Sequence, residues 1–225
     1  MTLDVPSLLT LAASCAPSVA PETLIAIVHA ESRFNPLAIG VNSPGVGVPK
    51  PATKAEAVMA ARDLIRRGYN IDLGLGQINS ANLAWLGLPV EDAFEPCRNL
   101  AAAARVLTIN YQAVIATAAS RDHAIATALS LYNTGDRRRG FRNGYVARVY
   151  ASGSIVIPQI RARAPSPARS LAPPDDIVAA TASSASQQQA AERTQTDAWN
   201  TAAQVRQASL MVFGAPVPPA KGQYP

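Results

Sequence analysis

The stretch Pro21-Glu22-Thr23-Leu24-Ile25-Ala26-Ile27-Val28-His29-Ala30-Glu31-Ser32-Arg33-Phe34-Asn35-Pro36 places a carboxylate at the end of an apolar helix. One helical face, spaced i, i+3, i+4 and i+7, comprises Leu24, Ile27, Val28 and Glu31. Pro36 predicts that the helix ends soon after Glu31. A glutamate on an apolar face costs free energy unless it is paired, protonated or used in chemistry. Two interpretations follow: a functional carboxyl, or a glutamate that pairs with an arginine or reaches solvent.

Composition restricts the class of protein. The 225 residues suffice for one core of about 100–150 residues and an additional segment. Hydrophobic residues make up 48% but aromatic residues only 5%, which is typical of closely packed helices. The net charge of +5 suits an anionic partner, but basic residues are scattered except at Arg137-Arg138-Arg139, and no nucleic-acid motif accompanies them. We therefore expect no nucleic-acid partner, and no apolar run long enough to predict a membrane helix is present.

Helices alternate with loops along the first two thirds of the chain. Thr53-Lys54-Ala55-Glu56 has the spacing of a capping box, and Gly68 suits the end of the helix that follows. Asn99 is expected to cap a long helix. Apolar periodicity predicts helices over residues 5–16, 21–32, 53–68, 99–117, 122–132 and 145–151. Residues 69–79 are expected to be extended, whereas 40–51 and 136–142 are predicted loops. The expected fold is mainly α with a minor β element.

The composition changes from Arg161 onward. A proline cluster between 165 and 174 is followed by an Ala/Ser/Gln stretch and by further prolines near residue 225. Such a segment has too few large apolar residues to form a core. We predict a domain over residues 1–158 and a flexible Pro/Ala/Gln-rich tail over residues 159–225.

Four segments resemble, in the same order, the motifs of the lysozyme-like soluble lytic transglycosylase family. Glu31-Ser32-Arg33-Phe34-Asn35-Pro36 is similar to its Glu-Ser-x-Phe-x-Pro motif, and Gly74-Leu75-Gly76-Gln77-Ile78-Asn79 to its Gly-Leu-Met-Gln-Ile motif. Leu131-Tyr132-Asn133-Thr134-Gly135 resembles Ala-Tyr-Asn-x-Gly, and Gly144-Tyr145-Val146-Ala147-Arg148-Val149 resembles the closing Tyr-Val-x-x-Val. With Pro96-Cys97-Arg98-Asn99-Leu100, the pattern is similar to the VirB-type transglycosylases of type IV secretion and conjugation machines.

The resemblance implies a lysozyme-like α+β domain that cleaves the β-1,4 bond between N-acetylmuramic acid and N-acetylglucosamine in peptidoglycan. Glu31 would protonate the leaving oxygen and then accept a proton from the O6 hydroxyl, which forms a 1,6-anhydro ring. No cofactor or metal is implied. The family acts in the periplasm, where it opens the wall for a secretion system, and the tail would contact components of that system. Residues 5–16 lack a basic flank and are expected to be a retained helix, so an export signal is absent or atypical.

The resemblance also assigns substrate-binding roles to residues around the acid. These residues are Ser32, Gln77, Asn79, Tyr132, Asn133 and Tyr145. Amide groups suit N-acetyl recognition, and a tyrosine can stack on a sugar or bond near Glu31. Simpler explanations remain for some of them. The tyrosines could be core aromatics, Asn133 could belong to a helix-ending turn, and Ser32 could bond locally.

Cys15 and Cys97 leave two interpretations open. They are either small buried thiols or, in an exported protein, one disulfide. We favour the disulfide if the protein is exported. It would close a loop of about eighty residues and stabilise the fold by roughly 4–5 kcal/mol in the entropic model.

Two rival functions follow from the same residues. A hydrolase of the same fold would need a second carboxylate to hold water, and Asp72 is the nearest candidate in sequence. Asp72 is more simply explained as a solvated loop or turn residue. The other rival is a non-enzymatic assembly factor that binds glycan, although such a protein would not need the acid at Glu31.

Overall fold

Helix α2 (Pro21–Ser32) lies at the centre of the domain because it is apolar on every side, not on one face only. Its residues from Leu24 to Val28 are all buried. Arg33 and Phe34 adopt left-handed backbone angles, with φ of 54° and 68°, so the chain turns sharply just after Glu31. The predicted helix 21–32 is therefore confirmed, and its end places Glu31 two residues before the turn that begins at Arg33.

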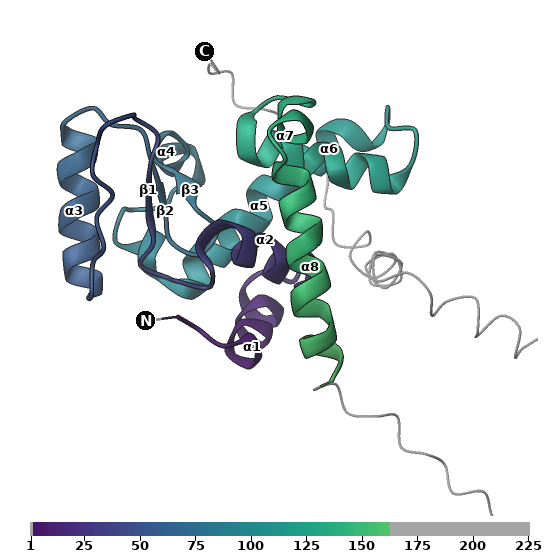
Figure 1. Ribbon diagram of the computed structural model, residues 1–225, viewed down its shortest axis with the longest axis horizontal. Coiled ribbons are helices and arrows are strands. Elements are labelled where there is room, and N and C mark those ends of the chain that lie inside the picture. Colours follow the sequence, from purple (N-terminus) through teal and green to yellow (C-terminus); the bar gives the residue numbers. More distant parts are fainter. Residues whose placement is uncertain (1, 163–225) are drawn as a thin grey trace, which may run out of the picture.

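The computed structural model describes residues 2–162, and the predicted tail from residue 163 onward lies outside them. The other helices are α1 (Val5–Cys15), α3 (Lys54–Arg66), α4 (Leu83–Leu86), α5 (Pro96–Ile115), α6 (Arg121–Thr134), α7 (Arg139–Arg142) and α8 (Tyr145–Arg161). The sheet lies with α3 and α4 on one side of the molecule, α6, α7 and α8 lie on the other side, and α2 and α5 lie between them (Figure 1). Short 3-10 turns cover Ser80–Asn82 and Asp92–Phe94. Within residues 2–162 no helix is both long and apolar enough to cross a membrane.

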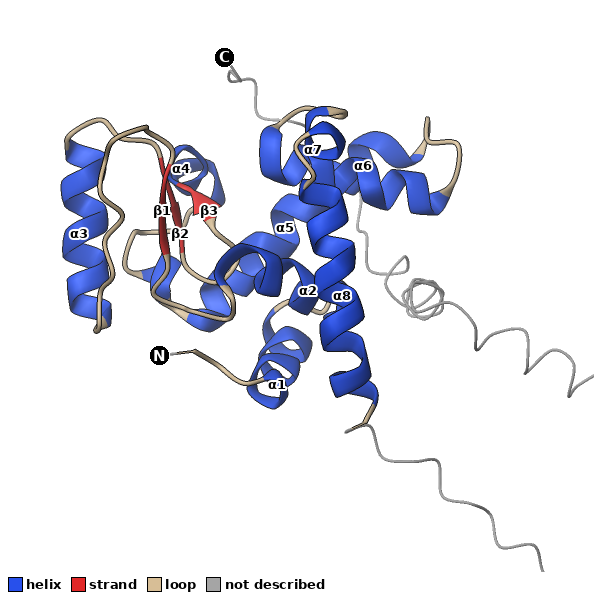
Figure 2. Ribbon diagram, viewed as in Figure 1, coloured by secondary structure: helices blue, strands red, loops and turns tan. Residues whose placement is uncertain are grey.

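Three short strands form an antiparallel sheet in the order β1 (Ile39–Val41), β2 (Ile71–Leu73) and β3 (Ile78–Asn79), drawn in red in Figure 2. Side chains alternate between the two faces of a strand. Ile71 and Leu73 are accordingly buried in the core, and Asp72 lies on the opposite face. The expected extended segment 69–79 is confirmed, but strand β1 extends into the segment that was predicted as loop.

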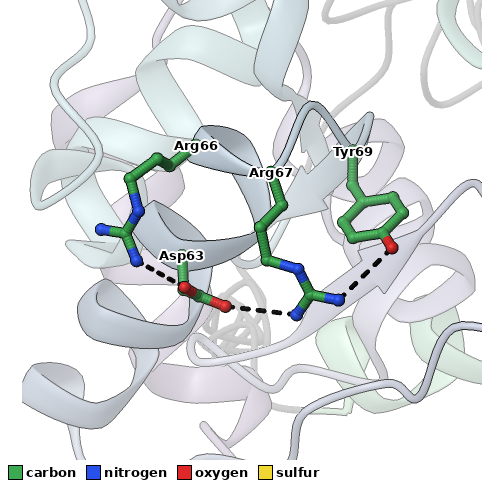
Figure 3. Close-up of polar contacts among 4 residues, drawn as sticks. All are labelled: Asp63, Arg66, Arg67 and Tyr69. Atoms are coloured by element: carbon green, nitrogen blue, oxygen red, sulfur yellow. Dashed lines mark hydrogen bonds and ion pairs between the residues drawn. The ribbon is translucent and has the colours of Figure 1, made fainter.

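Helix α3 flanks the sheet and begins and ends as the sequence predicts. Thr53 accepts a hydrogen bond from the Glu56 N–H, and the Glu56 carboxylate accepts one from the Ala52 N–H. At the other end, Asp63 binds Arg66 and Arg67, and Arg67 also donates to the Tyr69 hydroxyl (Figure 3). These ion pairs are exposed, so each contributes little to stability.

Helix α5 begins at Pro96, so the prediction that Asn99 caps it is wrong. A proline suits the first turn of a helix, where its missing N–H has no partner to lose. The fully buried Asn99 side chain instead organises the chain between the sheet and α5. Its oxygen accepts from Gly76 N at 2.7 Å, and its nitrogen donates to Leu73 O at 2.9 Å and Ala93 O at 2.7 Å.

Helix α8 extends well past the predicted end at residue 151, through the predicted domain boundary at residue 158 to Arg161. Ser152 and Gly153 interrupt the apolar pattern, and this is why the sequence suggested an earlier end. Both residues are buried, and the apolar stripe then resumes at Val156 and Ile157. Packing against α2 therefore overrides the weak helix propensity of these small residues.

The predicted disulfide between Cys15 and Cys97 is confirmed. It joins the last residue of α1 to the first turn of α5 across 82 residues of sequence. A cross-link over a loop of this length removes conformations from the unfolded chain, which is worth roughly 4–5 kcal/mol in the entropic model. The first helix is therefore covalently attached to the core.

We expect Asn99→Ala to lower the free energy of unfolding by about 3 kcal/mol, because buried backbone groups would lose their hydrogen-bond partner. Asn110 on the same helix provides a matched control, since its amide nitrogen has no hydrogen-bond partner within residues 2–162. Asn110→Ala should cost less than 1 kcal/mol by the same reasoning. Urea denaturation of both variants measures the difference. Equal losses would contradict the structural role of Asn99.

Candidate active site

The candidate site is built around Glu31, the penultimate residue of α2. Tyr145, the first residue of α8, donates a hydrogen bond from its hydroxyl to the Glu31 carboxylate, with 2.6 Å between the oxygens. The Tyr145 side chain is fully buried. The interaction joins the end of α2 to the beginning of α8, and so it orients the carboxyl.

The surroundings of Glu31 change its acidity. Burial raises the pKa of its carboxyl to about 7, although the hydrogen bond from Tyr145 opposes this shift. Two charges act in opposite directions: Asp72 also raises the Glu31 pKa, and Arg148 lowers it. A carboxyl with a pKa near neutrality can both donate and accept a proton, as a general acid–base catalyst must.

Tyr132, near the end of α6, lies against the turn between β2 and β3. Its hydroxyl donates to the Gly76 carbonyl oxygen at 2.7 Å. Burial, with the nearby charges of Glu31 and Asp72, raises its pKa well above the usual value, so the phenol stays neutral. A Cβ at position 76 would come within 2.9 Å of the Tyr132 hydroxyl, so this contact requires glycine.

Gln77 holds the same turn against β1. Its side-chain nitrogen donates to Gly74 O at 2.9 Å and to Ala38 O at 3.2 Å, which uses both of its N–H groups. Its oxygen lies beside Gly40, where a Cβ would approach to 2.8 Å. The Gln77 oxygen is therefore the part of this side chain that remains for a ligand within the described structure.

Asp72 lies on β2 among three asparagine side chains, so the expectation of a solvated loop residue is wrong. Its two oxygens accept hydrogen bonds from Asn79 and Asn42, each at 2.8 Å. The Asn70 oxygen accepts from the same two nitrogens, each at 2.7 Å. Burial raises the Asp72 pKa, whereas the two amide donors act to lower it. We call Asn42, Asn70 and Asn79 the amide cage.

Two other predicted site residues form local structure. Asn133 accepts a hydrogen bond from the side chain of Asn143, whose own oxygen accepts from the Tyr145 N–H. Asn133 therefore helps to hold the start of α8. Ser32 is buried and donates to Val28 O at 3.2 Å, in agreement with the simpler of its two interpretations.

Three residues of the site were not predicted from the sequence. Asn42 and Asn70 belong to the amide cage, and Arg148 lies with its guanidinium 5.5 Å from the centre of the Tyr145 ring. Arg148 follows Tyr145 by three residues on α8, a spacing that places both on one helical face. Asn70 precedes Asp72 by two residues in the segment predicted to be extended, so the alternation of side chains along a strand could have placed them on one face. No local signal indicates Asn42.

A separate pocket of about 560 Å³ lies between the C-terminal end of α5 and the N-terminal half of α6. Its walls include Val114, Thr127, Arg138, Phe141 and Arg142. The predicted solvated loop over residues 136–142 therefore contains helix α7 and forms part of a pocket wall. None of the site residues predicted from sequence lines this pocket.

Replacing Tyr145 with phenylalanine should raise the Glu31 pKa above its value of about 7, because the hydrogen bond that favours the ionised carboxylate is lost. This shift can be measured by following the NMR signal of the Glu31 carboxyl carbon during a pH titration. Tyr69→Phe, which removes a hydroxyl from the edge of α3, should leave the titration unchanged. An unchanged or lower Glu31 pKa in Tyr145→Phe would contradict this account.

Comparison with known proteins adds independent information. Residues 9–151 match the family model of the transglycosylase SLT domain. The protein virB1 of Agrobacterium fabrum is 41% identical over 152 residues, covering 68% of this chain and 61% of the relative. The type IV secretion system protein virB1 of Brucella suis is 38% identical over 178 residues, covering 74% of each. The chain thus spans about three fifths of the Agrobacterium relative. No solved structure matches.

Proposed function

Because the chain belongs to the transglycosylase SLT domain family, we propose that it is a lytic transglycosylase acting on the glycan strands of peptidoglycan. The observation that carries this proposal is Glu31, whose burial raises its pKa to about 7 while Tyr145 orients it. The bond cleaved is the β-1,4 bond between N-acetylmuramic acid and N-acetylglucosamine. A protonated carboxyl near neutral pH supplies the acid that breaking this bond requires.

In the first step, Glu31 donates its proton to the glycosidic oxygen as the bond from that oxygen to C1 of N-acetylmuramic acid breaks. The carbonyl oxygen of the neighbouring 2-acetamido group bonds to C1 and forms a positively charged bicyclic oxazolinium ion. The N-acetylglucosamine end leaves with the proton. Glu31 is now an anion, and the hydrogen bond from Tyr145 stabilises it.

In the second step, the O6 hydroxyl of the same N-acetylmuramic residue attacks C1. The bond between C1 and the acetamido oxygen breaks, and Glu31 accepts the O6 proton. The product is a 1,6-anhydro ring, water is not consumed, and Glu31 returns to its protonated form. A pKa near 7 suits both transfers, because the group must release and recover a proton at the same pH.

Other residues of the site are proposed to hold the sugars. The Gln77 oxygen can accept from an N-acetyl N–H or a hydroxyl, and Tyr132 offers ring surface beside Glu31. The buried Tyr145 acts through its hydrogen bond to Glu31. The glycines of the turn allow backbone groups to approach a ring closely. Ser32, Asn79 and Asn133 are proposed to act through the neighbours they hold rather than as the main sugar contacts.

The virB1 relatives suggest the biological setting. One of them is named a type IV secretion system protein. We extend this to the present chain: it acts in the periplasm, where local cleavage of the wall makes room for a secretion system. Components of that system would bind the predicted tail, which lies outside the described residues.

A hydrolase of the same fold is the second candidate, and the partly buried Asp72 is the observation that favours it. In that reaction a water molecule, not O6, would attack C1. The two products differ by one water, so their masses separate the two reactions.

The test is digestion of purified sacculi with the full chain, followed by mass spectrometry of the released muropeptides. We expect anhydro-muramyl products from the wild type and a loss of at least 10³-fold in rate for Glu31→Gln. Glu22→Gln alters the other glutamate of α2 and should retain activity. Reducing-end products would identify a hydrolase. No release by folded wild-type protein would favour the non-enzymatic assembly factor.

The pH dependence of stability predicts whether the Glu31→Gln variant remains folded. Because the folded-state pKa of about 7 exceeds the ordinary value of 4.5, the folded protein holds this proton more tightly than the unfolded chain. The contribution of Glu31 to stability is then largest below pH 4.5 and is lost as the pH rises through 7. Glu31→Gln should therefore be at least as stable as the wild type at pH 8, by thermal denaturation.

A further inference from the structure

The carboxylate of Asp72 has no role in the two steps above. Asp72 is the central residue of β2, between Gly40 on β1 and Asn79 on β3. Its two neighbours along the strand, Ile71 and Leu73, are buried in the core. The Asp72 side chain is therefore on the opposite face of the sheet, and a strand fixes its position more tightly than a loop would.

The charge of Asp72 acts on the groups that surround the acid. It raises the pKa of Glu31 and the pKa of the Tyr132 hydroxyl. Such coupling falls off with distance, and the Tyr132 hydroxyl also donates to the Gly76 carbonyl oxygen on the turn that follows β2. Asp72 and Glu31 therefore belong to one site, although they are far apart in sequence.

The glycine at position 40 lets the Asp72 and Gln77 side chains lie side by side. Gly40 is paired with Asp72 across the sheet, and a Cβ at position 40 would lie 3.5 Å from an Asp72 oxygen and 2.8 Å from the Gln77 oxygen. A side chain at this position would have to displace the Gln77 oxygen. The glycine therefore brings two hydrogen-bond acceptors together, one from Asp72 and one from Gln77.

The amide cage orients the Asp72 carboxylate without neutralising it. Each oxygen accepts one amide N–H, and a carboxylate can accept about four hydrogen bonds, so roughly half of this capacity remains. Within residues 2–162, no arginine, lysine or histidine nitrogen lies within 4 Å of Asp72 as an ion pair. The ligand that suits the remaining acceptors is a hydrogen-bond donor that gains positive charge.

We propose that Asp72 accepts the N–H of the 2-acetamido group on the N-acetylmuramic residue and directs the acetamido carbonyl oxygen toward C1. This inference rests on the proposed function. As the carbonyl oxygen bonds to C1 and the glycosidic bond breaks, positive charge develops on the acetamido group, and the Asp72 anion stabilises it. When O6 attacks and the bond from C1 to the carbonyl oxygen breaks, the charge disappears and the neutral amide returns. Asp72 gains and loses no proton.

The interaction is strongest in the charged intermediate and weaker in the bound substrate. An interaction of this kind lowers the reaction barrier instead of tightening substrate binding. Asn42 and Asn79 are positioning residues in this account, because they hold the two Asp72 oxygens in place. Gln77 would accept from a different part of the same sugar.

The test compares Asp72→Asn with Asp63→Asn, a matched change on the surface network of α3 (Figure 3). For Asp72→Asn we expect kcat on soluble glycan strands to fall about 10²-fold with KM within twofold. Asp63→Asn should leave both constants unchanged. Binding of N-acetylmuramic acid thiazoline, a stable analogue of the oxazolinium ion, should weaken at least tenfold in Asp72→Asn, whereas binding of chitotetraose should not change.

The dependence of kcat on pH provides a second test, because a purely structural role of Asp72 would leave it unchanged. Because Asp72 raises the Glu31 pKa, its neutralisation should lower that pKa and shift the alkaline limb of kcat to lower pH. Asn42→Ala should also reduce kcat, but by less than Asp72→Asn does, because the amide of Asn79 still donates to Asp72. This milder variant keeps the test available if Asp72→Asn fails to fold.

Three outcomes would overturn the inference. Full kcat and unchanged thiazoline binding in folded Asp72→Asn, with anhydro products as in the wild type, would leave the transglycosylase assignment intact and remove the role of Asp72. If Asp72→Asn does not fold, wild-type kcat in Asn42→Ala would remove the role of the cage. Reducing-end products from the wild type that disappear in Asp72→Asn would show that Asp72 holds water, and the proposed function would fail with it.

Discussion

The hydrogen bond from Tyr145 to Glu31 is the interaction on which the site depends. It connects the last turn of α2 to the first turn of α8, the two helices that pack most extensively against each other in the described domain. A carboxyl in these apolar surroundings would otherwise be free to rotate toward water. The same packing that builds the core therefore positions the acid and keeps it partly protonated.

The turn opposite the acid depends on a second constraint, the buried amide of Asn99. Its three hydrogen bonds hold the backbone at Leu73, Gly76 and Ala93, and they leave little space around the turn. A Cβ at Gly74 would come within 2.4 Å of the Asn99 nitrogen, and Gly74 also has a φ of +72°. The glycines of this turn are thus required by close packing against α5 as well as by the backbone conformation.

Opposing charges act on Glu31 from the two sides of the site. Asp72, from the sheet, favours the protonated acid, and Arg148, from α8, favours the anion that forms after the proton is released. The amide cage keeps Asp72 in place without a neutralising cation. This arrangement suits a group that must change its protonation state twice in one reaction.

Local patterns in the sequence determined the helices and several of their ends. The apolar spacing before Glu31, the capping pair at Thr53 and the disulfide between Cys15 and Cys97 are all confirmed, since each depends on neighbouring residues or on cysteine chemistry. The motif residues around Glu31, Tyr132 and Tyr145 also lie together, although their roles on substrate stay predictions.

Only the tertiary structure decided the features that depend on distant packing. The sequence suggested a cap for Asn99, a loop for Asp72 and an early end for α8, and all three expectations are wrong. In each case, burial against another element outweighed the local preference. The raised Glu31 pKa also requires segments that are far apart in sequence, because desolvation and charge act through space and leave no periodic pattern along the chain.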